Sequence, residues 1–140
     1  MYQEELREVR EAINAADHAL DCLYEAQDCL GSARTWGIVD ILGGGFISTF
    51  IKRSRMNDAS RCIHEAKAAM ATFRKELADV DQAMPLAIDE YDFWSFADYF
   101  FDGVFADFMV QSQIARARDQ VDEAITRVSE IRSQLTRLLE

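Results

Sequence analysis

IARARDQVDEAITRVSEIRSQLTRLL, residues 114–139, indicates the fold class of this chain. Its apolar residues recur at alternating spacings of three and four, at Ile114, Ala117, Val121, Ala124, Val128, Ile131, Leu135 and Leu138. Such heptads place one apolar seam along a slightly supercoiled helix. Polar side chains flank the seam, at Gln113, Gln120, Arg127 and Gln134. The resulting narrow stripe suits a two-stranded coiled-coil contact, and a second copy of the protein is one candidate for the other strand.

Two more stretches of the chain carry heptads. One comprises Leu6, Val9, Ile13, Ala16, Leu20, Leu23 and Leu30, and the other comprises Ile63, Ala66, Met70, Phe73, Leu77, Val80 and Met84. Small residues widen the stripe of the first, at Ala12, Ala15, Ala19, Cys22, Ala26 and Cys29. A wide stripe packs on more than one neighbour. We therefore predict an all-α fold, an antiparallel bundle of three long helices that forms one domain over residues 1–140.

Two connectors, at about residues 30–46 and 84–103, separate the predicted helices. They superimpose when the chain is shifted by 58 residues, which aligns Trp36 with Trp94, Asp40 with Asp98, and Gly45 with Gly103. Chance agreement between heptads would not align Trp, Asp and Gly in the same order. The sequence therefore predicts an internal two-fold repeat, with units of about 31–84 and 89–140.

The repeat has a geometric consequence in an antiparallel bundle. The second long helix closes one unit and opens the next, so the two equivalent turns are expected at opposite ends of the bundle. Pro85 should end the second helix, because proline lacks an amide hydrogen and clashes with the preceding turn. Short connector helices are expected near residues 36–42 and 86–89.

The connectors also carry a resemblance. The strings WGIVDILGGGFISTFIKRS, residues 36–54, and FADYFFDGVFADFMVQSQI, residues 96–114, resemble a pattern of small bacterial helical proteins to which no activity is attached. The resemblance covers about half of the chain, from Trp36 onward. It implies a bacterial, helical, cytoplasmic protein.

Composition and charge exclude several classes of function. The formal net charge of −10 repels phosphate backbones, so nucleic acid is not an expected partner. The N-terminus has no apolar signal-peptide core, and no run of about 18 apolar residues predicts a membrane span. The three cysteines, Cys22, Cys29 and Cys62, form no C-x-x-C pair and are expected to be reduced thiols in the cytoplasm.

Catalytic and metal sites are not expected either. His18 and His64 fall on polar positions of their heptads, and neither has the Glu-x-x-His spacing of carboxylate-bridged iron bundles. No cysteine is expected to have a helical histidine neighbour that would make a nucleophile pair. The acidic residues of the second connector could hold a divalent ion, but a helix dipole also favours them: Asp89, Glu90, Asp92, Asp98, Asp102 and Asp107. No cofactor is expected.

The turn motifs have a structural and a functional interpretation. Trp36 and Asp40, like Trp94 and Asp98, are four residues apart and share a helical face, so each carboxylate can accept a hydrogen bond from the indole. Such pairs lock the turns, or else they form a polar spot that faces a ligand. The triple glycine, Gly43, Gly44 and Gly45, allows close approach of helices or cradles an anion, whereas the second copy keeps only Gly103.

Two surfaces follow from the connectors. The aromatic residues of the second connector either plug the end of the bundle or form a homodimer contact, through Phe100, Phe101, Phe105 and Phe108. Basic residues follow the apolar first connector, at Lys52, Arg53 and Arg55, in the manner of a membrane-surface anchor.

The function predicted from these patterns is a non-catalytic helical interaction or scaffold module that self-associates. A homo-oligomer is the expected assembly, with another protein as a further partner. The alternative is peripheral binding to a membrane surface or an anionic ligand through Trp36 to Arg55.

Overall fold

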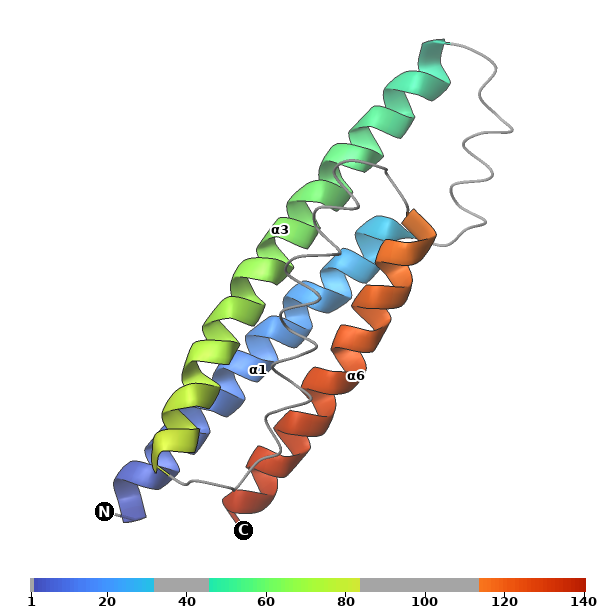
Figure 1. Ribbon diagram of the computed structural model, residues 1–140. Helices are drawn as coiled ribbons and strands as arrows, with labels where there is room; N and C mark the ends of the chain where they lie inside the picture. Colours follow the sequence, from blue (N-terminus) through green and yellow to red (C-terminus); the bar gives the residue numbers. More distant parts are fainter. Residues whose placement is uncertain (1, 32–45, 84–113) are drawn as a thin grey trace.

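The computed structural model describes residues 2–31, 46–83 and 114–140, which form three long helices (Figure 1). These are α1 (Tyr2–Leu30), α3 (Phe46–Ala83) and α6 (Ile114–Leu138). The regular structure of the described residues is helical throughout, which confirms the all-α fold class. None of these three helices combines the length and the apolar character that crossing a membrane requires.

The end of α1 is capped from two sides. Gly31 has a φ of 65°, and its amide donates to the carbonyls of Gln27 and Asp28, both at 3.1 Å. Glycine reaches this left-handed conformation without the steric penalty of a Cβ, which makes it the common residue after a helix end. Arg118 of α6 donates from Nη1 to the Gly31 carbonyl at 3.2 Å. The cap therefore also joins the end of α1 to the first turns of α6.

The seam residues form one continuous apolar core. Helix α1 packs against both α3 and α6, and its flanking alanines Ala12, Ala19 and Ala26 are fully buried. On α3 the largest fully buried side chain is Phe73. The wide stripe predicted for the first helix is thereby confirmed, because two neighbours cover it.

The seam of α6 is used inside the chain. Val121, Ala124, Val128 and Leu135 are fully buried, and the flanking Gln120 is only 6% exposed. A second copy of the protein was one candidate for the partner of this narrow seam. The structure corrects that expectation, because the seam is already covered within one chain.

Polar contacts establish the direction of α6 relative to α1. Arg118, near the start of α6, contacts Gly31 at the end of α1, whereas Arg132 forms an ion pair with Asp17, earlier in α1. The hydrogen bond and the negative charge of Asp17 raise the pKa of Arg132 above its ordinary value. The contact nearer the start of α6 is made with the end of α1, and the contact farther along α6 is made with an earlier residue of α1. The two helices are therefore antiparallel.

Helix α3 is also antiparallel to α1, so α3 and α6 run in the same direction. Cys29 near the end of α1 is bonded to Cys62 of α3, whereas Glu8 near the start of α1 lies beside Asp79. Three helices that alternate in direction would place α6 antiparallel to α3, and this part of the prediction is wrong (Figure 1). Heptads predict which face of a helix is buried, but they carry no information on its direction.

A disulfide between Cys29 and Cys62 joins α1 to α3 across 33 positions of sequence. Only Cys22 is a free thiol among the three cysteines. This overturns the expectation of three reduced thiols. Spacing along the sequence could not reveal the pair, because its Cα–Cα distance of 6.7 Å is created by the register between two helices.

Candidate functional site

An acidic hollow lies where the start of α1 meets the end of α3. Its volume is about 490 Å³, and its lining is Glu4, Glu5, Glu8, Asp79, Gln82 and Ala83. Four carboxylates in one hollow repel one another and attract cationic groups. No motif in the sequence predicted this site. The spacings of three and four between acidic residues along each helix are visible in the sequence. Whether the acidic residues of α1 lie beside those of α3 depends on how the two helices pack.

Carboxylate oxygens crowd together beside the hollow. Those of Glu8, Glu76 and Asp79 lie within 4.8 Å of one another, and all three side chains are half-buried. Glu8 Oε2 and Glu76 Oε2 are buried and accept no hydrogen bond. The group offers one oxygen from each residue, which is half or less of the six to eight ligands that Ca²⁺ takes.

The carboxyl group of Glu76 has a shifted proton affinity. Burial raises the pKa of Glu76, and the negative charges of Asp79, Glu11 and Glu8 raise it further, while Lys75 opposes the shift. A raised pKa means that the folded protein holds the Glu76 proton more tightly than an exposed glutamate would. As the pH falls, Glu76 therefore gains its proton before an exposed glutamate would.

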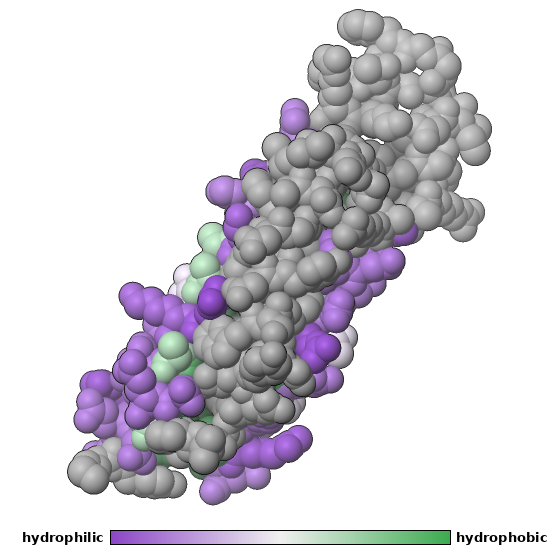
Figure 2. All heavy atoms as spheres, in the orientation of Figure 1, coloured by the Kyte–Doolittle hydropathy of each residue, from purple (hydrophilic) through white to green (hydrophobic). Residues whose placement is uncertain are grey.

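A second surface lies on α3, on the side that faces away from α1. We call it the α3 outer face, and it comprises His64, Lys67, Ala68, Ala71, Arg74, Lys75 and Ala78. Two shallow hollows of about 460 and 400 Å³ adjoin along it and share Ala71 and Arg74. Figure 2 shows pale green atoms of weakly apolar residues among purple ones along the edge of the molecule that α3 forms in Figure 1.

The α3 outer face differs from the rest of the protein in charge and side-chain size. It carries Lys67, Arg74 and Lys75, whereas the chain as a whole has a net charge of −10. Its exposed apolar residues, Ala68 and Ala71, are small. The sequence analysis missed this face, although its residues recur at spacings of three and four on the side opposite the buried seam. Such spacings place these residues on one side of the helix.

Cys22 and His18 are neighbours on one face of α1, which the sequence pattern showed but the prediction overlooked. They are four residues apart on α1, and the Cys22 sulfur lies 3.9 Å from His18 Nε2. However, burial raises the pKa of the Cys22 thiol, and the charges of Glu65, Glu25 and Asp21 raise it further. A reactive thiolate needs the opposite shift. The surroundings of this pair therefore do not activate the sulfur as a nucleophile.

Most of the sites predicted from sequence lie outside the described residues. These are the turn motifs at Trp36, Asp40, Gly43, Gly44, Gly45, Trp94, Asp98 and Gly103, the aromatic interface at Phe100, Phe101, Phe105 and Phe108, and the acidic connector. The connector helices expected near residues 36–42 and 86–89 also lie there. Lys52, Arg53 and Arg55 belong to α3, where the structure describes their backbone only.

The comparisons with known proteins give no family. The chain matches no protein-family model, no curated protein and no solved structure.

Proposed function

We propose that this chain is a non-catalytic helical interaction module that self-associates. The observation that carries the proposal is the α3 outer face, a basic and alanine-rich surface on an acidic protein. Small side chains let a second helix approach closely, and lysine and arginine attract the acidic residues that predominate elsewhere on the chain. Most soluble oligomers are built from copies of one chain, and a further copy of this chain offers such an acidic surface.

The aromatic connector remains a second contact in this proposal. Phe100, Phe101, Phe105 and Phe108 would add apolar area that the alanines of the α3 outer face do not supply. The seam of α6 is left out of the proposal, because α1 covers it. Support for a non-catalytic role comes from Cys22 beside His18, because burial and nearby carboxylates raise the pKa of its thiol.

The duplicated bundle is also part of the proposal, as one domain with units of about 31–84 and 89–140. Support comes from the registers of α3 and α6, because residues 58 positions apart on these two helices lie beside the same part of α1. A shift of 58 residues carries Cys62 to Gln120, and both are buried. Cys62 of α3 is bonded to Cys29 of α1. Two residues before Cys29, the Gln27 side chain donates a hydrogen bond of 2.6 Å to Asp122 of α6, which lies two residues after Gln120.

Peripheral binding to a membrane or another anionic surface is the alternative function. The first turns of α3 extend beyond the end of α1 and the start of α6 (Figure 1). Lys52, Arg53 and Arg55 belong to this extension, because they precede Cys62, which is bonded to Cys29 near the end of α1. Basic residues at a projecting helix end favour contact with anionic lipids.

We propose a bacterial protein that folds in an oxidising compartment. Disulfides persist mainly in oxidising compartments, so the Cys29–Cys62 bond disfavours the cytoplasmic location expected from the sequence. Trapping of free thiols in the source cells before lysis separates the two locations. One modified cysteine per chain indicates an oxidising compartment, and three indicate the cytoplasm.

Light scattering over a hundredfold range of concentration tests self-association. A mass that rises to a multiple of the chain mass supports the proposal. A single-chain mass at every concentration refutes it, and anionic vesicles then test the alternative. Membrane binding predicts flotation with the vesicles that weakens with added salt and with Lys52→Glu plus Arg53→Glu.

A further inference from the structure

We infer that Cys29 is a thiol–disulfide exchange site, at which an external dithiol reversibly opens the covalent link between α1 and α3. The Cys29–Cys62 bond is then a redox switch, and Glu25 accepts a hydrogen bond from the thiol that is released at Cys62. Three observations carry this: the unequal exposure of the two cysteines, a carboxylate beside one sulfur, and a core that joins the helices without the bond.

The two cysteines of the bond differ in exposure. Cys29 is partly exposed on α1, whereas Cys62 of α3 has no exposed surface. A thiolate from solution must reach the sulfur that it attacks, and the other sulfur of the bond is then the leaving group. The fold therefore directs the attack to Cys29 and makes Cys62 the leaving group.

Exchange at Cys29 proceeds in two steps. One thiolate of the dithiol attacks Cys29 Sγ, so a mixed disulfide forms at Cys29 while the bond to Cys62 breaks. Cys62 leaves as a thiolate and takes up a proton from water. The second thiolate of the dithiol then attacks the dithiol sulfur of the mixed disulfide and releases Cys29, which is protonated in turn. The protein gains two electrons and two protons, and the dithiol loses both and becomes a cyclic disulfide.

A carboxylate lies beside the sulfur that is released. Glu25 Oε1 is 3.9 Å from Cys62 Sγ. A disulfide sulfur carries no hydrogen, so Cys62 can donate to Glu25 only after reduction has made it a thiol. This hydrogen bond stabilises the reduced state alone and shifts the equilibrium toward the dithiol form of the protein. The usual net contribution of one hydrogen bond corresponds to about two- to tenfold in that equilibrium.

Re-oxidation requires the two thiols to stay close together. Ala26 and Leu30 of α1 and Ala59 of α3 flank the bond in the sequence, and all three are fully buried in the continuous core. This packing does not include the bond, so it keeps Cys29 beside Cys62 after reduction. An oxidant of the disulfide class can then form the same bond again.

The third cysteine stays a thiol throughout. Cys22 lies two helical turns before Cys29, and burial together with neighbouring carboxylates raises the pKa of its thiol. A raised pKa leaves little thiolate at neutral pH, and only the thiolate attacks a disulfide. Exchange is therefore confined to Cys29 and Cys62.

Peptide mapping of the mixed disulfide tests the direction of attack. The folded natural chain reacts briefly with 2-mercaptoethanol, acid stops the exchange, and the free thiols are alkylated in denaturant before mass spectrometry. The reagent on Cys29 with the alkyl group on Cys62 should be at least about tenfold more frequent than the reverse. If the same reaction is run in urea, both arrangements should be equally frequent. Cys22→Ala should give the same map as the natural chain.

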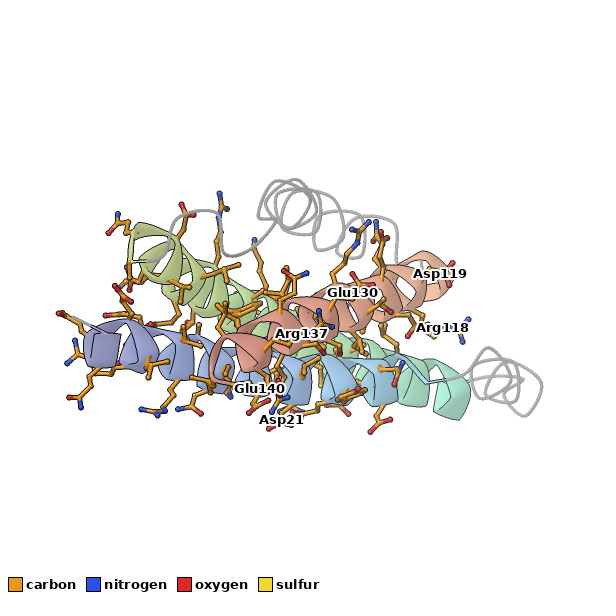
Figure 3. All side chains as sticks on the ribbon, turned by 90° about the horizontal axis from the view of Figure 1, so that it is seen from below. Asp21, Arg118, Asp119, Glu130, Arg137 and Glu140 are labelled. Atoms are coloured by element: carbon orange, nitrogen blue, oxygen red, sulfur yellow. A yellow bond between two sulfur atoms is a disulfide. The ribbon has the colours of Figure 1, made fainter. Side chains whose placement is uncertain are left out.

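Equilibration with reduced and oxidised dithiothreitol tests Glu25. Glu25→Ala should shift the ratio of dithiol to disulfide protein about two- to tenfold toward the disulfide, and Glu25→Gln, which keeps an acceptor, should shift it less. Asp21→Ala is the matched control, because Asp21, labelled in Figure 3, is exposed on α1 one turn before Glu25. Its ratio should equal that of the natural chain. Circular dichroism checks that each variant keeps its helix content.

Each outcome supports the inference or overturns it. Attack mainly at Cys29, together with a shifted ratio in Glu25→Ala alone, supports it. Equal attack on Cys29 and Cys62 in the folded chain overturns it, as does a Glu25→Ala ratio equal to that of the natural chain. A reduced chain that does not form the same bond again in oxidised dithiothreitol also overturns it. If Glu25→Ala loses helix, the map of the natural chain still decides, because it needs no variant.

Discussion

Reduction of the Cys29–Cys62 disulfide should destabilise the folded chain strongly. The bond closes a loop across 33 positions of sequence, and loop closure of this length lowers the entropy of the unfolded chain by an amount worth about 3.7 kcal/mol at 25 °C. The entropy of unfolding of 140 residues is about 290 cal/mol/K near the melting temperature, so losing this stabilisation corresponds to a fall in Tm of about 13 °C. This is an upper value, because residual structure in the reduced unfolded chain decreases it.

The assay is thermal unfolding, followed by circular dichroism, with and without a phosphine reductant. Thiol titration under denaturing conditions should count one free thiol, that of Cys22, before reduction and three after it. The double variant Cys29→Ala plus Cys62→Ala is the control, and its Tm should not respond to the reductant. Cys22→Ala should keep the full response.

Two results would refute this reasoning. Three free thiols in the protein before reduction would show that the disulfide is absent. A change in Tm of less than about 2 °C, with the thiol count rising from one to three, would show that loop closure contributes little to stability.

Three further predictions concern single residues. The pKa of Glu76 is raised in the folded state, so the contribution of this group to stability should increase as pH falls from 7 toward about 4.3, and Glu76→Gln should raise Tm at pH 7 and lose this advantage in acid. A variant whose Tm follows that of the natural chain at every pH would contradict this. Gly31→Ala should cost about 1–2 kcal/mol in urea unfolding because φ is 65°, and Gly31→Asn should cost less. Equal losses would exclude a conformational cause. Leu23→Ala should cost about 3–5 kcal/mol because Leu23 is fully buried, whereas Tyr24→Ala, at a side chain 48% exposed, should be nearly neutral. A small loss at Leu23 would mean that the core is looser than the structure indicates.

Burial along each helix could be predicted from the sequence. The heptads placed residues such as Val121, Val128 and Leu77 in the core, and all three are buried. The end of α1 at Gly31 and the end of α3 before Pro85 were also predictable. Glycine permits the left-handed conformation that ends a helix, and proline prevents a helix from continuing. These features depend on residues that are close together in the sequence, so the sequence alone predicts them.

Features that depend on register between helices could not be predicted. The Cys29–Cys62 bond and the meeting of Glu8 with Asp79 both require α1 and α3 to be aligned at one level. The direction of α6 depends on the chain that leads to it, and no heptad encodes it. The pair of His18 and Cys22 is different, since a spacing of four on a helix was visible and was overlooked.

The common direction of α3 and α6 has a consequence for mechanical load. Because both run opposite to α1, the start of α1 and the end of α6 lie at the same end of the bundle (Figure 1). A force that pulls these two ends apart acts across the α1–α6 contact and peels it open from that end, one turn after another. Asp17–Arg132 would rupture before Gly31–Arg118. The disulfide would still hold α1 to α3, so α6 would detach first. The force would then act on α1 and α3 as a disulfide-linked helical hairpin.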